Sequence, residues 1–244
     1  MHDGAIVFKS CNRGGLETPE NLKNRGVEYF AEIARELAPR GKKIIGSVVG
    51  ASEEEFVDVA RMLDRAGISI VELNLADDYV AKSVAPFASF ERLKSLLGRV
   101  RGETGCALAV KVPPQAPFEP RAIADLFKSM RIAIAVCAND LPQEFAIDIA
   151  SGTVKGPPRT LSPAHAFFKE SENLIDVVAV GGINTGRDAY IAHLMGAKAV
   201  QVGSALMKEG AGALGRIERE LNSILAEHSH RSVSEIVGKV RFGG

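Results

Sequence analysis

The sequence predicts an α/β fold of the TIM (β/α)8 barrel type, in which parallel strands alternate with helices. Apolar runs of strand length alternate with stretches of helical apolar spacing along the chain. The last two apolar runs each end in a turn of very small residues, Gly181-Gly182 and Gly203-Ser204. The length of 244 residues suits one barrel better than two domains, so we expect a single domain over residues 1–244.

Seven apolar runs have the length and composition of strands. They are continuous rather than alternating, which is typical of a parallel sheet covered on both faces. A (β/α)8 barrel needs eight strands, and if the two small-residue turns follow strands 7 and 8, the strand without a counterpart is the first. We therefore expect a domain that is short at its N-terminus. The seven expected strands are Ala5–Phe8, Ile44–Val49, Ile70–Leu75, Ala107–Val112, Ala133–Ala138, Val177–Val180 and Ala199–Val202.

Between the strands, apolar residues recur three and four positions apart, which is the spacing of a helix that buries one face. Ser52, with Glu55 three residues later, is the signature of a helix N-terminus. The longest stretch without a helix or strand pattern, Leu141–Leu161, is expected to be an irregular loop. The expected helices are Gly26–Leu37, one beginning at Ser52, Phe90–Val100, Pro120–Met130, Ser162–Phe168, Arg187–Met195, Gly210–Leu225 and Val233–Val240.

Composition excludes several classes of partner. Lys plus Arg and Asp plus Glu both number 30, so no net charge draws the protein to nucleic acid or to an acidic membrane. No apolar run is long enough to span a bilayer, and the sequence does not open on a signal-peptide pattern. The three cysteines lack metal-type spacing, so we expect no metal site and a reduced, cytoplasmic protein.

The two small-residue turns predict an anion site. Backbone N–H groups that no side chain covers form a cradle for an anion, most often a phosphate. In (β/α)8 barrels that cradle follows strands 7 and 8. Tight turns alone would also explain the glycines, since glycine reaches left-handed backbone angles at little steric cost.

Polar residues lie at the carboxyl ends of several of the other expected strands. Lys9-Ser10, Asn74, Lys111 and Asn139 all lie at the end of an apolar run. In a barrel, the carboxyl ends of the strands carry the chemistry, and a lysine there is costly unless it meets an anion. A phosphorylated cofactor with delocalised negative charge, such as reduced flavin, suits this set. Each lysine taken alone is equally well explained as a solvated residue at the start of a loop.

The motifs at these strand ends resemble those of dihydroorotate dehydrogenases, most closely of the soluble, fumarate-linked branch. The resemblance implies an FMN-binding barrel that oxidises dihydroorotate to orotate in pyrimidine biosynthesis, with fumarate or a related acceptor reoxidising the flavin. It also implies a homodimer. The motifs that carry it are Ala5–Ser10, Gly46–Gly50, Val71–Leu75, Val110–Pro114, Gly181–Ala189 and Val200–Leu206.

The resemblance also implies roles for individual residues. Lys9 and Ser10 would contact FMN, and Lys111 would lie at the pyrimidine ring of the flavin. Asn74 and Asn139 would hydrogen-bond the substrate, a task for which an amide offers a donor and an acceptor together. The residues expected to hold the phosphate are Gly181, Gly182, Gly203 and Ser204.

The sequence departs from the family pattern after Asn74. Asp77 stands where the family has its catalytic cysteine, and Tyr79 stands where it has a substrate-binding asparagine. An unperturbed carboxyl has a pKa of about 3.9, against about 8.5 for a thiol, so a carboxylate is the weaker base. Burial and the neighbouring Asp78 would strengthen it. We expect Asp77 to act as the catalytic base, with Lys111 stabilising the reduced flavin; a solvated loop carboxylate is the plainer interpretation of Asp77.

Two other functions remain open from the sequence. The chain could be a degenerate homologue that binds FMN or another phosphorylated ligand without turning over dihydroorotate, as the loss of the cysteine indicates. It could also be a phosphate-binding barrel enzyme without flavin, in which a strand-end lysine forms a Schiff base with a carbonyl substrate.

Overall fold

A computed structural model describes residues 6–11, 25–41, 43–114, 116–137, 146–148, 153–155 and 163–242. The chain forms two compact units. The first contains residues 1–112, 116–118 and 126–133, and the second contains residues 113–115, 119–125 and 134–244. Helix α5 (Pro120–Ser129) contributes residues to both units.

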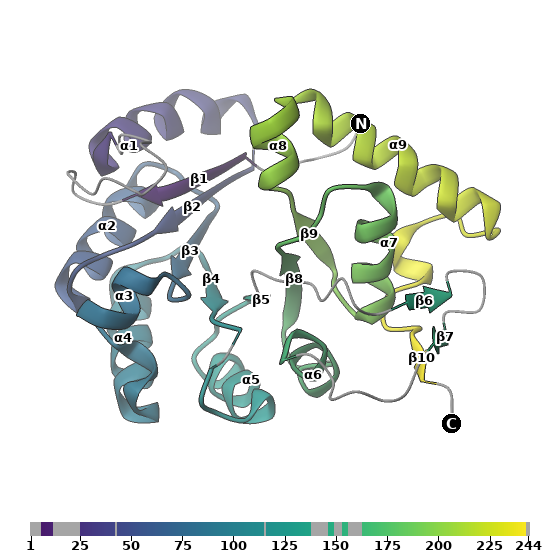
Figure 1. The fold of residues 1–244 in the computed structure, drawn as a ribbon. Coiled ribbons are helices and arrows are strands. Elements are labelled where there is room, and N and C mark those ends of the chain that lie inside the picture. Colours follow the sequence, from purple (N-terminus) through teal and green to yellow (C-terminus); the bar gives the residue numbers. More distant parts are fainter. Residues whose placement is uncertain are drawn as a thin grey trace. The chain divides into compact units, whose positions relative to one another are not determined.

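The first unit is built on four parallel strands in the order β1-β2-β3-β4. Helices α1, α2 and α4 lie along them (Figure 1). The side chain of Leu63 on α2 lies so close to Gly46 on β2 that a Cβ there would meet its Cδ1 at 2.7 Å. That contact identifies the helix-covered face of the sheet. The elements are β1 (Ile6–Cys11), α1 (Gly26–Leu37), β2 (Ile44–Val48), α2 (Glu53–Arg65), β3 (Ile70–Asn74), α3 (Asp78–Ser83), α4 (Phe90–Glu103) and β4 (Ala107–Val112).

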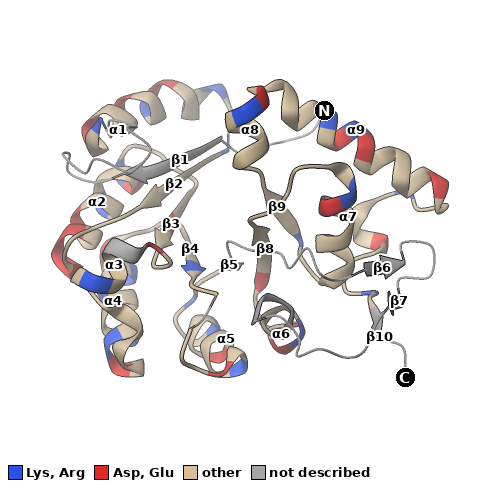
Figure 2. Cartoon of the chain, in the orientation of Figure 1, with Lys and Arg blue, Asp and Glu red and all other residues tan. Residues whose placement is uncertain are grey.

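Two helices of this unit, α2 and α4, begin at a serine that caps them. Ser52 caps α2, with its hydroxyl accepting a hydrogen bond from the Glu55 amide at 3.2 Å. Ser89 caps α4 in the same way through the Arg92 amide, also at 3.2 Å. The charged residues lie along α1, α2 and α4 (Figure 2), while their apolar side chains are buried. This amphipathic arrangement is what the apolar spacing of the sequence predicts.

The second unit contains three parallel strands in the order β5-β8-β9. Helices α7 and α9 lie side by side in it (Figure 1), and the backbone of Gly186 in α7 packs against Glu220 and Leu221 in α9. Every expected strand of the two units is present within three residues of its expected bounds. The elements are β5 (Ile134–Cys137), α6 (Pro163–Glu170), β8 (Asp176–Val180), α7 (Gly186–Met195), β9 (Ala199–Gln201), α8 (Ser204–Glu209) and α9 (Gly212–Glu227).

A second, three-stranded sheet corrects the expectation of an irregular loop over Leu141–Leu161. Strands β6 (Ala146–Asp148) and β7 (Thr153–Lys155) form an antiparallel hairpin, and β10 (Arg241–Phe242) pairs with β7 in parallel. Strands of two or three residues are too short to show a periodic pattern. Their third partner comes from the far end of the chain, which no local signal reveals.

The expected helix Val233–Val240 is wrong. The segment begins with a single 3-10 turn, Val233–Glu235, and Gly238 then takes a left-handed φ of 73°. Its backbone instead hydrogen-bonds to the last residues of α7. The amides of Gly238 and Val240 donate to the carbonyls of His193 and Leu194 at 3.1 and 3.0 Å. Two short helices that the sequence did not predict, α3 and α8, begin close behind β3 and β9.

No helix in the described ranges combines the length and the apolar character that crossing a bilayer requires.

The contact between α7 and α9 generates a stability prediction. A Cβ at Gly186 would lie 2.3 Å from the Leu221 nitrogen and 2.4 Å from the Glu220 Cβ, so the backbones must separate. We expect Gly186→Ala to lower the free energy of unfolding by about 1–3 kcal/mol, the usual cost of overpacking. Urea denaturation followed by circular dichroism measures it.

Gly215→Ala is the matched control within α9. Its Cβ would meet only the flexible Arg219 side chain, at 3.4 Å, so the substitution should be neutral or stabilising by up to about 1 kcal/mol. A Gly186→Ala variant as stable as the wild-type protein would show that the two helices are not held in this close contact.

Candidate active site

In the first unit, the strand register brings two expected site residues together. Asn74, the last residue of β3, is the register partner of Lys111 on β4. Both belong to the face opposite Gly46, because the register pairs Gly46 with Val71 and side chains alternate along a strand. Ser47 and Glu72 belong to that same face. The face opposite this helix contact is therefore polar at the ends of β3 and β4.

Three of these polar side chains are buried. Ser47 and Glu72 are each 2% exposed, and the Ser47 hydroxyl donates a hydrogen bond to the Glu72 carboxylate at 3.0 Å. Asn74 is 6% exposed, and its side-chain oxygen has no hydrogen-bond partner among the described residues. A buried acceptor without a donor costs free energy, and such groups in native proteins usually meet a ligand or an ordered water. The Asn74 oxygen thus marks a place where a ligand donor fits.

Asp77 lies in the turn after β3, three residues beyond Asn74, and its side chain is half-buried. Its main-chain oxygen accepts a hydrogen bond from the Ala81 amide at 2.9 Å, which places it at the start of α3. Asn74 and Asp77 therefore lie at the same end of β3. The side chains of Asp78 and Tyr79 lie outside the described part of the structure.

Lys9 and Ser10 lie on β1, at a break in its pairing with β2. Phe8 pairs with Gly46 and Cys11 with Val48, so β1 has one residue more than β2 in this interval. Bulges of this kind are common beside active sites. The side chains of Lys9 and Ser10, and the whole of Asn139, lie outside the described residues, so their expected roles stay predictions.

Two thiols near the strands are not candidates for the missing catalytic cysteine. Cys137 ends β5 and is 2% exposed, and burial raises the pKa of its thiol well above the usual value. Cys106 precedes β4, and burial, with the nearby Asp64 carboxylate, raises its pKa to about 12. Reactive cysteines have the opposite character, with a lowered pKa and access to solvent.

In the second unit, the two small-residue turns follow adjacent strands at the same end, because Val180 of β8 pairs with Gln201 of β9 in parallel. Gly181 and Gly182 take left-handed φ angles of 95° and 69°, which other residues adopt only at a cost. A Cβ added at Gly203 would meet nothing within 4 Å, and Gly203 and Ser204 are exposed. Open space beside Gly203 fits a bound phosphate.

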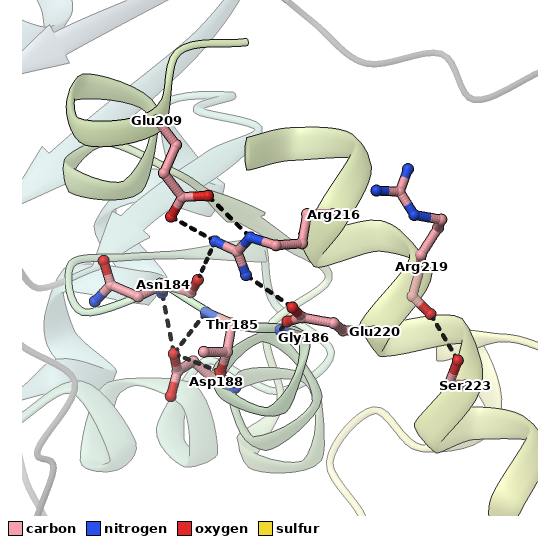
Figure 3. Close-up of polar contacts among 9 residues, drawn as sticks. All are labelled: Asn184, Thr185, Gly186, Asp188, Glu209, Arg216, Arg219, Glu220 and Ser223. Atoms are coloured by element: carbon pink, nitrogen blue, oxygen red, sulfur yellow. Dashed lines mark hydrogen bonds and ion pairs between the residues drawn. The ribbon is translucent and has the colours of Figure 1, made fainter. Parts of the chain in front are cut away.

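The N-terminus of α7 is already occupied by carboxylates. Asp188 accepts hydrogen bonds from the amides of Asn184 and Thr185 at 3.0 and 2.8 Å, and the Glu220 carboxylate accepts one from the Gly186 amide at 2.7 Å (Figure 3). These three amides already donate to carboxylates and are therefore not available to bind an anion. A phosphate at this turn would have to use the glycine amides that precede them.

Arg216 of α9 joins this turn to α8. It donates two hydrogen bonds to Glu209, one to Glu220 and one to the Asn184 carbonyl, over 2.7–3.0 Å (Figure 3). The Gly186 amide and Arg216 lower the pKa of the Glu220 carboxyl, and the two glutamates raise the pKa of Arg216. None of the residues expected from the sequence to form the site belongs to this cluster. Only Thr185 and Asp188, spaced as a capping box, gave a local signal.

Comparisons with known proteins agree with the strand-end motifs. The sequence profile of the family described as dihydroorotate dehydrogenase matches residues 12–225. A Trypanosoma cruzi protein named dihydroorotate dehydrogenase (fumarate) is 30% identical, over 98% of this chain and 87% of that protein.

Solved structures share the fold. Ligand-free DHODH from Eimeria tenella matches with a TM-score of 0.72 at 17% identity, over 96% of this chain and 81% of that one. DHODH from the same organism in complex with ferulenol matches with a TM-score of 0.71 at 17% identity, over 96% of this chain and 77% of that one. These neighbours are TIM barrels, and the likeness confirms the predicted fold class.

The two thiols generate a labelling prediction. A thiol whose pKa is about 12 is ionised in only about one molecule in ten thousand at pH 8. We therefore expect Cys106 and Cys137 to resist iodoacetamide in the native protein at pH 8 and to react fully in urea. Peptide mass spectrometry resolves each site. Rapid native alkylation of Cys137 would show that its thiol is accessible and would reopen it as a candidate base.

Proposed function

The chain belongs to the dihydroorotate dehydrogenase family, a family of flavin oxidoreductases, and on that premise we propose that it oxidises dihydroorotate to orotate with FMN. We propose fumarate or a related acceptor as the oxidant of the flavin, and pyrimidine biosynthesis in the cytoplasm as the setting. We also propose that the two units belong to one FMN-binding barrel domain, and that the protein is a homodimer. The observation that carries the activity is the buried, unpartnered oxygen of Asn74, in register with Lys111.

The residues at the strand ends fit FMN. The left-handed glycines and the open space at Gly203 support a phosphate site at Gly181, Gly182, Gly203 and Ser204. Lys111 supports the assignment of the flavin ring, since a cation there stabilises negative charge that develops on the pyrimidine. Lys9 and Ser10 are proposed as further contacts on the strength of the family motif. When bound, FMN supplies the acceptor for the hydride that leaves the substrate.

The chain's own residues orient the substrate and move its proton. The Asn74 oxygen accepts a hydrogen bond from a ring N–H of dihydroorotate, which supplies the donor that the buried oxygen lacks. Asn139 is proposed to hold the opposite side of the ring. Asp77, at the same strand end as Asn74, takes the proton from the ring carbon next to the one that loses the hydride.

A second function is favoured by the identity of the proposed base. A carboxylate is intrinsically a weaker base than the thiolate of the family pattern. If Asp77 cannot perform the proton transfer, the protein is a homologue that binds FMN or another phosphorylated ligand without oxidising dihydroorotate. A purified protein that takes up no FMN, or one whose bound flavin dihydroorotate does not reduce, is the signature of that function.

Anaerobic reduction of the FMN-loaded protein tests the proposal. We expect dihydroorotate to bleach the flavin absorbance of the wild-type protein. Asp77→Asn should slow the bleaching by about a hundredfold or more, because general-base catalysis contributes factors of that size, and should leave FMN affinity unchanged. Stopped-flow absorbance measures the rate.

Asn74→Leu provides an independent control, since it removes the unpartnered acceptor and should weaken substrate binding without changing the flavin spectrum. Wild-type protein that binds FMN but stays oxidised in saturating dihydroorotate would establish the second function. Wild-type protein that binds no FMN would contradict the oxidation of dihydroorotate and leave only a homologue that binds another phosphorylated ligand.

A further inference from the structure

We propose that Arg216 is a positioning residue for the cofactor phosphate, and that it acts by tying the turn after β8 to the helix after β9. This inference rests on the proposed function, because it concerns the phosphate site of FMN. The hydrogen bonds of Arg216 go to Glu209, Glu220 and Asn184, and not to the four residues assigned to the phosphate. Arg216 acts through Asn184 on one side and Glu209 on the other.

The first connection runs to Gly182. The Arg216 guanidinium donates to the Asn184 carbonyl at 3.0 Å, and the Asn184 side-chain amide donates to the Gly182 carbonyl at 3.1 Å. The Asn184 amide is fixed in addition by Asp188 at 3.0 Å. Arg216 is therefore two hydrogen bonds away from a residue of the left-handed glycine pair.

The second connection runs to α8, the helix that begins at Ser204. Glu209 is the last residue of α8, and Arg216 holds its carboxylate with two hydrogen bonds, of 2.9 and 2.7 Å. Paired bonds of this kind fix orientation as well as distance. Because α8 has only six residues, its last residue and its first move together. Arg216 thus constrains both small-residue turns at once.

The helix that carries Arg216 is held in place by close packing. Its own helix, α9, packs against α7 at Gly186 so closely that no Cβ fits between them. Glu220, one turn further along α9, holds both the Gly186 amide at 2.7 Å and Arg216 at 2.8 Å. The Arg216 side chain is 31% exposed. A side chain held on one rigid helix can set the spacing of two turns that would otherwise vary independently.

The geometry demands arginine rather than a positive charge alone. Four hydrogen bonds leave the guanidinium for three different groups. A planar fork of five N–H donors can satisfy them together, whereas a lysine ammonium is a point charge with three donors and cannot span the same set. Arg216→Lys should therefore fail in the same way as Arg216→Met.

Comparing FMN with riboflavin tests the role, because riboflavin lacks the phosphate. We expect wild-type protein to bind FMN more tightly than riboflavin. Arg216→Met should weaken FMN binding by about tenfold, the equivalent of one lost charge-assisted hydrogen bond, while riboflavin binding changes little. Quenching of flavin fluorescence measures both affinities. Glu209→Gln should cause a smaller loss of FMN affinity, since the bonds of Arg216 to Asn184 and Glu220 remain.

Arg219→Met is the matched control. Arg219 lies on the same helix, and its guanidinium points away from the cluster (Figure 3). Its substitution removes the same charge, and it should leave the preference for FMN over riboflavin unchanged. Hydrogen exchange of the ligand-free protein adds a readout without cofactor: the peptide that contains Asn184–Gly186 should exchange faster in Arg216→Met than in Arg219→Met.

The outcomes separate the inference from the proposed function. An Arg216→Met protein with the wild-type preference for FMN contradicts the inference alone, as does equal weakening of FMN and riboflavin, which would indicate a general structural role. Recovery of FMN affinity in Arg216→Lys would show that charge suffices and would also overturn it. Wild-type protein that binds neither flavin contradicts the proposed function, and the inference with it.

Discussion

The parallel register of β3 and β4 is the constraint on which the proposed chemistry depends. It pairs Asn74 with Lys111 at the strand ends and puts both on the face that carries Ser47 and Glu72. The opposite face is held against helices by contacts such as that between Gly46 and Leu63. A shift of one residue in either strand would turn these polar side chains toward the helices. There they would lack hydrogen-bond partners. Packing on one face thus fixes the chemistry on the other.

In the second unit, the proposed chemistry depends on where backbone amides are placed. Two glycines with left-handed φ angles form the turn after β8. The carboxylates of Asp188 and Glu220 accept hydrogen bonds from the backbone amides at the N-terminus of α7. A bound anion therefore cannot use the amides at the N-terminus of α7. The amides of the preceding glycine turn remain for it. Arg216 balances part of the negative charge of Glu209 and Glu220. Rigidity of this kind favours binding, since a preformed site loses less entropy when its ligand arrives.

The sequence predicted the strands well because a buried parallel strand is a continuous apolar run, which is a local property. It also placed Asn74 and Lys111 at strand ends, and the structure confirms that they are neighbours. It could not predict the sheet of β6, β7 and β10, whose short strands pair across a long separation. The helix expected at Val233–Val240 failed because Gly238 and Val240 bond to the end of α7. Apolar spacing carries no information about such a partner.

The same distinction holds within the candidate site. Thr185 and Asp188 cap α7 over three residues and could have been found from the sequence. Arg216 reaches Asn184 across 32 residues, so only a structure brings them together. Asp77 was assigned by comparison with a family motif; the structure describes it in the turn after β3, and its role as a base stays a prediction.

A crystal structure of the protein with FMN and orotate tests the central claim most directly. We expect phosphate oxygens at about 3 Å from backbone nitrogens of the two small-residue turns, and an orotate ring nitrogen at the same distance from the Asn74 oxygen. Phosphate bound elsewhere, or an Asn74 oxygen facing only protein or water, would contradict it.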